Sequence, residues 1–330
     1  MFASKTLLLT GGTGFFGQSF LSYCIKNKIK FKKIIIFSRD EFKQYEMQKI
    51  YDPAKYKFLR YFLGDVRDGE RLKVAFRDVD FVLHAAALKH VPAAEYNPTE
   101  YIKTNIVGSQ NVIEAGMYNK VKKIIALSTD KAASPLNLYG ATKLCLEKLF
   151  TSSNNYVGNQ NISFSCIRYG NVLGSRGSVL PLFLEQEKKD FFTITDSRMT
   201  RFNIMIEDCI KIVFFALKNS AGGEIFIPKV SSINIVDLAK AVNSKKKIKY
   251  IGIRPGEKLH EELVTSAESL NTYYFGKYYA IITNQGLTKK LKKAKMQSGY
   301  NSKDNHFLTV PQIRKLINKY KWNIPQFLLQ

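Results

Sequence analysis

The sequence predicts an α/β protein whose main part is a doubly wound parallel sheet, with a smaller α/β lobe added to it. Up to about residue 170, six apolar runs rich in β-branched residues alternate with segments of helical apolar spacing. A glycine-rich turn lies between the first run and the first helical segment. Such alternation is typical of parallel sheets that bind ligands at the carboxyl ends of their strands. A chain of 330 residues, 45% of them apolar, is long enough for both parts.

Each element follows from its own run of residues. The expected strands are, in order, TLLLT, KKIIIF, KFLRYFLGD, DFVLHAAA, KKIIALS and ISFSCIRYG. The expected helices are FFGQSFLSYCIKN, residues near 41–50, 68–77 and 98–117, and the segment after Asn137. We assign residues 1–170, with 202–229 returning to them, to the main domain. Residues 171–201 and 230–330 are assigned to the smaller lobe.

The first turn, TGGTGFFG over residues 10–17, predicts that the main domain binds a dinucleotide. Its glycines Gly11, Gly14 and Gly17 fall between a strand and a helix. Glycine there lets the backbone turn tightly and lets a pyrophosphate approach the helix N-terminus. A plain structural turn is the alternative interpretation, and the strand–turn–helix context favours the dinucleotide.

The residues after the second strand favour NADP over NAD. An NAD enzyme normally carries Asp or Glu about 20 residues after the glycines, to bind the ribose hydroxyls. Here Ser38 and Arg39 stand in that region, and a hydroxyl with a guanidinium suits a 2′-phosphate. Asp40 is close enough to keep NAD as the less favoured alternative, and an Arg39 that merely faces solvent is a further one.

The composition excludes some functions and leaves others open. The 51 basic and 27 acidic residues give a net charge of +24, but the lysines are spread along the chain, and their densest groups, Lys245 to Lys247 and Lys289 to Lys295, lack interleaved aromatic residues. We therefore expect a solvated basic surface and no nucleic-acid partner. No apolar run reaches the length of a membrane span, so we expect a cytoplasmic protein. The scattered cysteines predict buried free thiols and no metal site: Cys24, Cys145, Cys166 and Cys209.

Residues 128–143, STDKAASPLNLYGATK, carry the reactive groups of the chain. Tyr139 and Lys143 are four residues apart, so on a helix both side chains share one face. An ammonium and a positively charged cofactor would lower the pKa of the phenol and make it a base toward a sugar hydroxyl. Such a pair is common by chance, but here it follows a fifth strand ending at Thr129 and lies downstream of the glycine turn. That context predicts a short-chain dehydrogenase/reductase.

The second half offers groups for a phosphorylated substrate. The loop around Arg176 is rich in Gly, Ser and Arg, and Arg201 and Arg254 lie on turn-like segments. Three such arginines would suit a diphosphate, whereas a flexible surface loop is the alternative for the first. Asp65, after the third strand, either accepts a hydrogen bond from adenine or is an ordinary loop acid.

Together, TGGTGFFG, HAAALKHVPAAEYNP, STDKA, YGATK, RYGNV and RPGEKLHE resemble the extended short-chain dehydrogenases/reductases of the polysaccharide-biosynthesis type, which act on nucleotide sugars. The resemblance runs from about residue 5 to about residue 283 and is strongest to the inverting UDP-N-acetylglucosamine 4,6-dehydratases of pseudaminic acid synthesis and flagellin glycosylation. It implies a Rossmann domain, NADP, UDP-N-acetylglucosamine as substrate and a homo-oligomer.

The resemblance also implies a mechanism. Oxidation at sugar C4 acidifies the C5 proton, the C6 hydroxyl leaves as water, and hydride returns to C6. Beyond Thr129, Tyr139 and Lys143, elimination needs an acid and a base, which Asp130 and Lys131 are placed to supply. Retaining relatives have Glu where Lys131 stands, so this lysine predicts inversion at C5. A lysine base must be partly neutral, so we expect its pKa to be depressed.

The resemblance implies further contacts, residue by residue. The cofactor is expected to contact Gly11, Thr13, Gly14, Phe15, Phe16, Gly17, Ser38, Arg39, Asp65, Val66, Ala85, Lys89, Tyr139, Lys143 and Val172. The nucleotide sugar is expected to contact Lys89, Thr104, Asn171, Arg176, Arg201, Arg254 and Glu257. A C4 epimerase or a retaining dehydratase is the alternative enzyme. A loop ion pair is the alternative for Asp130 and Lys131, and a cofactor-sensing or nucleic-acid-binding protein is the alternative of another class.

Overall fold

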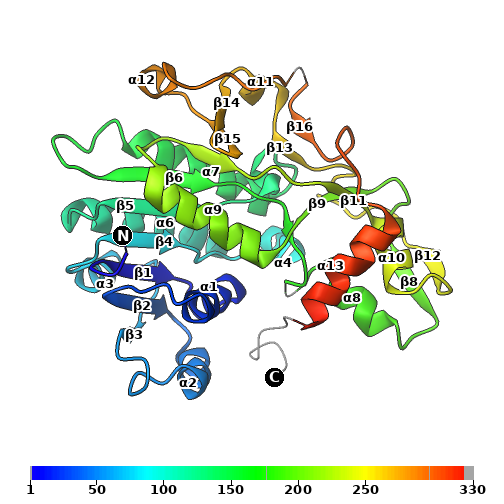
Figure 1. Ribbon diagram of the computed structural model, residues 1–330, viewed down its shortest axis with the longest axis horizontal. Coiled ribbons are helices and arrows are strands. Elements are labelled where there is room, and N and C mark those ends of the chain that lie inside the picture. The colour runs from blue at the N-terminus through cyan, green and yellow to red at the C-terminus, as the bar shows by residue number, and fades with distance from the viewer. Residues whose placement is uncertain (1, 176, 297, 323–330) are drawn as a thin grey trace.

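The computed structural model describes residues 2–175, 177–296 and 298–322, and its centre is a nine-stranded sheet (Figure 1). From one edge to the other, its strands are β14 (Thr272–Phe275), β15 (Tyr278–Ile281), β10 (Ile225–Ile227), β6 (Ser163–Ile167), β5 (Lys123–Leu127), β4 (Phe81–His84), β1 (Thr6–Thr10), β2 (Lys33–Ser38) and β3 (Leu59–Leu63). From β10 to β3, each strand is parallel to its neighbours in this run, which confirms the doubly wound sheet. The reversal of strand order between β1 and β4 is the place where such sheets bind ligands.

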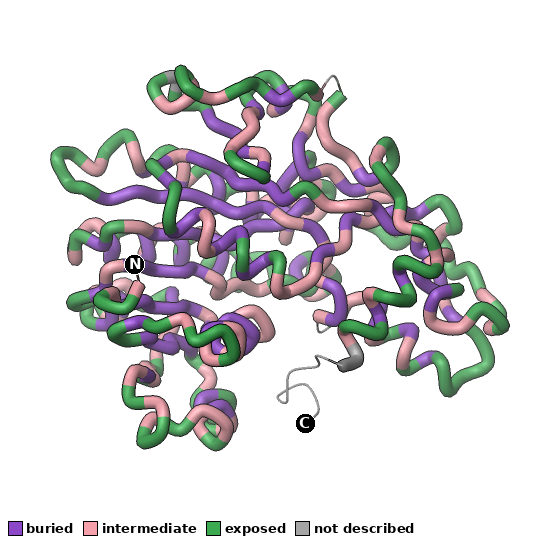
Figure 2. Tube along the Cα trace, in the orientation of Figure 1, coloured by how far each residue is buried: buried purple, intermediate pink, exposed green. Residues whose placement is uncertain are grey.

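Helices cover both faces of this sheet. Helices α1 (Phe15–Lys26) and α9 (Ile206–Asn219) pack on one face, and α3 (Gly69–Ala75), α6 (Gly108–Tyr118) and α7 (Leu138–Ser153) pack on the other. The alternation of strand side chains decides this: Leu7 and Leu9 join the first face, and Leu8 joins the second. Each fully buried leucine contributes about 1.5–3 kcal/mol. Figure 2 shows the central strands as the buried part of the molecule.

The expected elements of the main domain are present, with one difference between the fourth and fifth strands. Helix α2 (Glu41–Ile50) begins at its expected position, where Asp40 caps it. The helix expected near residues 98–117 is present and continuous through α5 (Pro98–Tyr101), η1 (Ile102–Val107) and α6, but η1 is π-helical, and a separate short helix, α4 (Val91–Tyr96), precedes it. The Asn105 side chain forms hydrogen bonds with Leu88 and Thr142, so this irregular turn is fixed to the end of β4 and to α7.

The smaller lobe has its own sheets and its own apolar core. Its strands form three small sheets: β11 (Ser232–Asn234), β9 (Thr200–Ile204) and β7 (Asn171–Val172); β12 (Lys247–Tyr250) and β8 (Phe191–Ile194); and β13 (Glu262–Val264) and β16 (Tyr300–Asn301). Its helices are α8 (Val179–Gln186), α10 (Ile235–Val242), α11 (Ser266–Ser269) and α13 (Val310–Trp322). The short helix α12 (Gln285–Thr288) packs by Leu287 against the core of the main domain instead. Leu180, Phe192, Leu238 and Ile313 are buried together in this core. The helical tail α13 therefore belongs to the lobe.

Two segments lie on the other side of the expected boundary. The hairpin β14–β15 falls within residues 230–330, which we assigned to the lobe, yet β15 pairs antiparallel with β10 in the main sheet. Residues 202–204, which we assigned to the main domain, belong to β9 and pair with β7 and β11 of the lobe. The physical reason is backbone pairing: β10 would otherwise present an unpaired edge, and the hairpin covers it.

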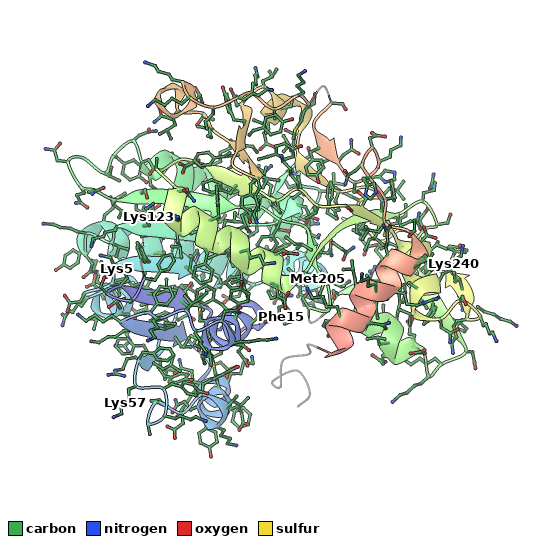
Figure 3. All side chains as sticks on the ribbon, in the orientation of Figure 1. Lys5, Phe15, Lys57, Lys123, Met205 and Lys240 are labelled. Carbon is green, nitrogen blue, oxygen red and sulfur yellow. The ribbon has the colours of Figure 1, made fainter. Side chains whose placement is uncertain are left out.

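The positions of lysines and cysteines can be compared with what the sequence led us to expect. Lys57 and Lys240 lie in widely separated parts of the molecule, whereas Lys5 and Lys123 lie near one another beside Asp80 (Figure 3). Cys145 is exposed rather than buried, because it lies on the outward side of α7, whereas the other three cysteines are buried free thiols. Among the described residues, no helix has the length and apolar character needed to cross a membrane.

Candidate active site

The site begins where β5 ends. Asp130 follows Thr129 in a short 3-10 turn, η2 (Asp130–Ala132), and its backbone N–H donates to the carbonyl of Tyr169 at 3.0 Å. The hydroxyl of Thr129 donates to Asp130 Oδ1 at 2.9 Å. Asp130 is completely buried. The side chain of Asp130 is therefore buried just after the carboxyl end of β5, the position that the sequence predicted for it.

Helix α7 lies directly against this turn. Asn137 caps the helix by accepting a hydrogen bond from the N–H of Gly140 at 2.8 Å, and its amide donates to Gly256 of the smaller lobe at 2.9 Å. A Cβ on Gly140 would collide with the carbonyl oxygen of Lys131. Glycine at this position therefore allows the helix that carries Tyr139 and Lys143 to approach the turn that carries Asp130 and Lys131.

The protein groups alone do not lower the pKa of Tyr139. Lys143 donates to the carbonyl of Leu127 at 2.6 Å, and burial lowers the pKa of Lys143 to about 8. Burial raises the pKa of Tyr139 to about 12, although Lys131 and a hydrogen bond with Thr129 oppose that rise. We expected Lys143 and a positive cofactor to lower it; in the protein itself the nearest opposing cation is Lys131.

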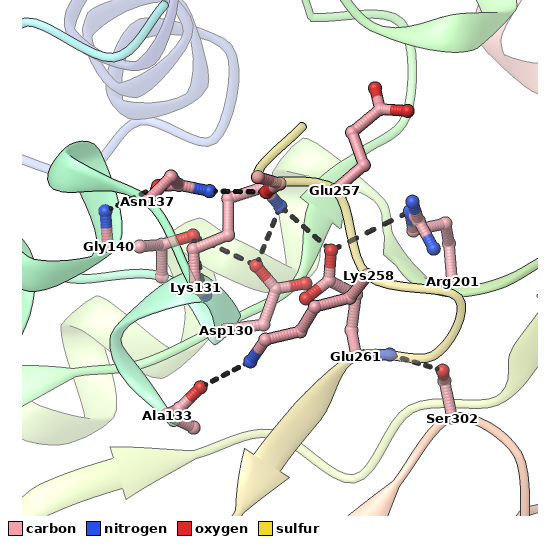
Figure 4. Close-up of polar contacts among 12 residues, drawn as sticks. Asp130, Lys131, Ala133, Asn137, Gly140, Arg201, Glu257, Lys258, Glu261 and Ser302 are labelled. Atoms are coloured by element: carbon pink, nitrogen blue, oxygen red, sulfur yellow. Dashed lines mark hydrogen bonds and ion pairs between the residues drawn. The ribbon is translucent and has the colours of Figure 1, made fainter. Parts of the chain in front are cut away.

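Lys131, whose side chain is 24% exposed, lies at the centre of a cluster of charges in which the acids Asp130 and Glu261 are buried (Figure 4). Its Nζ is 3.0 Å from Asp130 Oδ1 and 3.5 Å from Oε1 of Glu261, whose side chain is 3% exposed. The same Glu261 oxygen lies 3.7 Å from Nε of Arg201. We call these four residues the lysine cluster. It joins the strand end of the main domain to two segments of the smaller lobe.

The pKa values in the lysine cluster differ from one of our expectations. Burial would lower the pKa of Lys131, but the carboxylates of Asp130 and Glu261 outweigh it and raise that pKa. The expected depressed pKa is therefore wrong for the protein as it stands, and Lys131 is an ammonium. Burial raises the pKa of Asp130 in spite of Lys131, which suits the proton donor we expected there.

Sequence reasoning missed Glu261. The motif RPGEKLHE was recognised, but only Arg254 and Glu257 were selected from it. The available signal was an acid placed directly before the apolar strand β13, a position where burial is expected. Lys258 was also missed; its Nζ donates to the carbonyl of Ala133 at 2.6 Å and holds this loop against the end of turn η2.

The first turn has the form that a dinucleotide requires. Gly11 has φ +66°, and a Cβ there would lie 2.8 Å from Ala86 of the β4 end. Gly14 caps α1 without a side-chain hydrogen bond, so the first N–H groups of the helix are not covered by its own cap. Such an uncapped helix N-terminus suits a pyrophosphate.

The ends of β2 and β3 bring Ser38, Arg39 and Asp65 together. Arg39, whose side chain is half exposed, lies 3.8 Å from Asp65, and Arg67 lies 2.7 Å from the same carboxylate. Asp40 is used differently: its side chain accepts from the backbone of Lys43 at the start of α2. Asp40, the acid that made NAD an alternative cofactor, therefore caps helix α2.

The remaining expected substrate residues are only partly gathered. Arg254 is exposed and pairs with Glu257 at 2.5 Å, outside the lysine cluster. Among the described residues, Thr104 Oγ1, Asn171 Oδ1 and Glu257 Oε2 are buried atoms without a hydrogen-bond partner, as expected of groups that await a ligand. Lys89 is exposed, and partial desolvation of its ammonium lowers its pKa, with Lys131 adding to the effect. Arg176 lies outside the described residues.

Comparison with known proteins identifies the family. The sequence profile of the family described as "Polysaccharide biosynthesis protein" matches residues 7–283. The chain belongs to this family. It is 57% identical over 284 residues to a UDP-N-acetylglucosamine 4,6-dehydratase (inverting) of Campylobacter jejuni, covering 85% of this chain and 84% of that protein. It is also 42% identical over 331 residues to a UDP-glucose 4-epimerase of Rickettsia bellii, covering 96% of both.

Solved structures agree with this assignment. A structure of Pen from Bacillus thuringiensis superposes with a TM-score of 0.89 at 39% identity, covering 97% of this chain and 99% of that one. DesIV, a dTDP-glucose 4,6-dehydratase from Streptomyces venezuelae, superposes with a TM-score of 0.70 at 18% identity, covering 96% and 97% of the two chains, and shares the fold. The resemblance to extended short-chain dehydrogenases/reductases is confirmed.

In this polysaccharide biosynthesis protein, two kinds of acid–base group meet at one strand end. Tyr139 and Lys143 are four residues apart on α7, the spacing from which we expect a phenol and an ammonium that serve hydride transfer to a nicotinamide. Asp130 and Lys131 add a buried acid and a partly exposed amine within contact of one another. The site therefore holds groups for oxidation of an alcohol and, separately, for removal of a proton and protonation of a leaving hydroxyl.

Proposed function

We propose that the protein is an inverting UDP-N-acetylglucosamine 4,6-dehydratase. The observation that carries the proposal is the buried contact of Asp130 with Lys131 beside the Tyr139–Lys143 pair, because oxidation alone does not need a second acid and base. The similarity to the inverting dehydratase of Campylobacter jejuni supports the same substrate and reaction. The product is a UDP-4-keto-6-deoxy sugar of the L-arabino configuration.

The first step is oxidation at C4. The Tyr139 phenolate takes the proton of the C4 hydroxyl, and the Lys143 ammonium and the Thr129 hydroxyl hold the phenol in position. A bound nicotinamide dinucleotide supplies the hydride acceptor and later returns the hydride, so the reaction is redox-neutral. Its positive charge also provides the lowering of the Tyr139 pKa that the protein groups lack. Burial of these groups keeps water out of the step.

The second step is elimination. The C4 ketone acidifies the C5 proton. Lys131 removes that proton to give an enolate, after its ammonium has released a proton to water at its 24% exposed side chain. Asp130 then donates its proton to the C6 hydroxyl, which leaves as water. Hydride adds at C6, and a proton returns to C5 on the opposite face, so that centre is inverted.

The cofactor we propose is NADP. The half-exposed guanidinium of Arg39 stands at the end of β2, and Asp40, the acid that could bind ribose hydroxyls, caps α2 instead. Titration calorimetry with both oxidised cofactors tests this. We expect tighter binding of NADP and a loss of that preference in Arg39→Ala, and clearly tighter NAD binding would contradict it.

The reaction is tested by incubating the protein with UDP-N-acetylglucosamine and identifying the product by NMR. A 6-deoxy-4-ketone with inverted C5 is the expected product. An unchanged C5 would instead indicate a retaining dehydratase. A product that keeps its C6 hydroxyl would indicate a C4 epimerase, the alternative favoured by the relatives from Rickettsia.

The wider role follows from the product. A 6-deoxy-4-keto amino sugar suits the synthesis of surface glycans such as pseudaminic acid, including those attached to flagellin, and we propose that use. Loss of that glycan in a deletion strain is the test. The homo-oligomer and the cytoplasmic location stay predictions, which sedimentation velocity and cell fractionation measure.

A further inference from the structure

The fold gathers lysines that are far apart in the sequence at one edge of the main sheet. From β10 to β3 the strands are parallel, so their amino ends share the edge opposite to the carboxyl ends, where Asp130 lies. The segments that enter the strands there are residues 3–5, 26–33, 52–58, 76–80, 119–123, 154–162 and 218–224. They hold 4 acidic and 13 basic residues, the latter being Lys5, Lys26, Lys28, Lys30, Lys32, Lys33, Lys55, Lys57, Arg77, Lys120, Lys122, Lys123 and Lys218. We call this surface the basic edge.

Contacts between neighbouring segments show that the basic edge is one continuous surface. The backbone N–H of Lys32 donates to the carbonyl of Lys5 at 2.9 Å. The carboxylate of Asp80 lies 3.4 Å from Nζ of Lys5 and 2.7 Å from Nζ of Lys122, so three strand starts meet at this acid. Figure 3 shows Lys5 on the side of the molecule that faces away from Lys240 and the smaller lobe.

Most charges of the basic edge have no counter-ion in the protein. Of its 13 basic side chains, 11 are exposed, and within the described part of the chain only Lys5 and Lys122 form an ion pair, both with Asp80. Helix dipoles favour the cations next to the ends of α1, α3, α6 and α9. They do not account for the lysines that lead into β2 and β3, such as Lys30 and Lys57. This concentration of unpaired charge favours an anionic partner.

The basic edge also offers a recess and exposed aromatic rings. A groove of about 320 Å³ is lined by side chains that carry hydrogen-bond donors, namely Lys120, Lys122, Asn159, Gln160 and Asn161. Ammonium and amide donors together suit the oxygens of a phosphate group. Tyr118, at the end of α6, and Tyr156, before β6, are 70% and 53% exposed. An exposed tyrosine suits the boundary between water and an apolar layer.

We propose that the basic edge binds the anionic phospholipid surface of a membrane, while the edge that carries Asp130 faces the aqueous side. The proposal goes beyond the dehydratase function and does not depend on it. Each lysine close to an anionic membrane surface strengthens binding about fivefold, so several exposed lysines suffice without a membrane-spanning helix. A nucleic acid fits less well, because the ring that alternates with the lysines before β2, Phe31, is buried in the core and cannot stack on a base.

The test is sedimentation of the full chain with vesicles of phosphatidylcholine, alone or with about 30% phosphatidylglycerol. We expect binding to the anionic vesicles only, and weaker binding as the salt concentration rises, because the charges in contact are exposed. The triple variant Lys30→Glu, Lys32→Glu and Lys57→Glu should weaken binding on the order of 100-fold. Lys30→Glu alone should weaken it about fivefold, which keeps the test valid if the triple variant does not fold.

The matched control is the triple variant Lys245→Glu, Lys247→Glu and Lys249→Glu. It makes the same change in net charge at exposed lysines of the smaller lobe and should weaken binding less than about threefold. Equal losses in the two triple variants would mean attraction by net charge alone and overturn the inference.

Three other results would contradict the proposal: no binding of the wild type to anionic vesicles, equal binding to neutral ones, or tighter binding of single-stranded RNA that the first triple variant abolishes. The last would assign the basic edge to nucleic acid. A wild type that binds anionic vesicles through this edge but makes no dehydrated product would support the inference and refute only the proposed function.

Discussion

Two buried ionic clusters in this protein differ in how completely their atoms are paired. In the first, which we call the arginine cluster, all five N–H groups of Arg168 are used. They donate to Glu147 of α7, to Glu268 of α11 and to the carbonyl of Leu263, at 2.6–3.1 Å. Arg168 is fully buried. This cluster connects the main domain to the smaller lobe and leaves no donor of the guanidinium for a ligand.

The lysine cluster is built from similar groups but is incomplete. Asp130 Oδ2 and Glu261 Oε2 are buried without partners among the described residues, and the contact of Lys131 with Glu261 is 3.5 Å long. A satisfied cluster fixes structure, whereas buried acids with unused oxygens retain the capacity to move protons. We infer from this difference that complete pairing, rather than burial, separates the structural ions of this protein from the ions we expect to react.

The largest expected effect is the loss of C5 chemistry in Lys131→Met. Without the amine, C5 exchange should fall by about 10⁴-fold, which corresponds to about 5 kcal/mol in the barrier. C4 oxidation should persist, because Tyr139 and Lys143 remain. Single-turnover absorbance and NMR in heavy water measure the two steps. Rapid C5 exchange in this variant would show that the lysine cluster is only structural.

The next effect concerns the arginine cluster. Arg168→Met leaves the buried carboxylate of Glu147 and the partly buried one of Glu268 without their partner, and it should lower the free energy of unfolding by about 3–5 kcal/mol. Denaturant unfolding measures this. The control is Arg198→Met, an exposed arginine paired with Asp196, which should change stability by less than about 1 kcal/mol. A change equally small for Arg168→Met would remove the distinction between the two clusters.

A pH effect of about 3 kcal/mol is expected from Lys143. Its pKa is about 8 in the folded protein because of burial, against an ordinary value of 10.5. Below pH 8 the lysine is charged in both states, and its burial destabilises the fold. As pH rises from 8 to 10.5 the folded state loses the proton first, so stability rises and then levels off.

Comparison of unfolding free energies for the wild type and Lys143→Met across that window isolates this group, because the other lysines cancel. The wild type should gain stability relative to the variant as pH rises. If the difference in unfolding free energy between the wild type and Lys143→Met stayed constant with pH, the charge of Lys143 would have to be stabilised in the fold as fully as that of Arg168.

The smallest expected effect tests the contact between α7 and the lysine cluster. Gly140→Ala places a methyl group against the carbonyl of Lys131, which should cost about 1–3 kcal/mol of stability and slow C5 exchange. Gly69→Ala is the control, since its Cβ would lie 3.6 Å from Asn111, an ordinary contact. Equal behaviour of the two variants in thermal unfolding and turnover would show that the close packing of α7 against the carbonyl of Lys131 is not needed.

The sequence predicted the parts of the fold and site that depend on local pattern. The six apolar runs, the glycine turn and the spacing of Tyr139 and Lys143 are short-range signals, and the strands and helix α7 follow them. The pairing of β15 with β10 is a long-range choice between sheets, which the alternating pattern of a hairpin does not specify.

Glu261 shows the same limit within the site. Its contact with Lys131 joins residues 130 positions apart, so no spacing rule could reveal it. The raised pKa of Lys131 was missed for the same reason, because one of the two carboxylates responsible was unknown. Local chemistry could be predicted from the sequence, whereas the electrostatic state of the base depended on the tertiary fold.

The most direct test of the central claim is the wild-type reaction with UDP-N-acetylglucosamine followed by NMR in heavy water. The claim is that the lysine cluster removes and returns a proton at C5. We predict that the 6-deoxy-4-keto product carries deuterium at C5 with that centre inverted. A dehydrated product without deuterium at C5 would contradict the account.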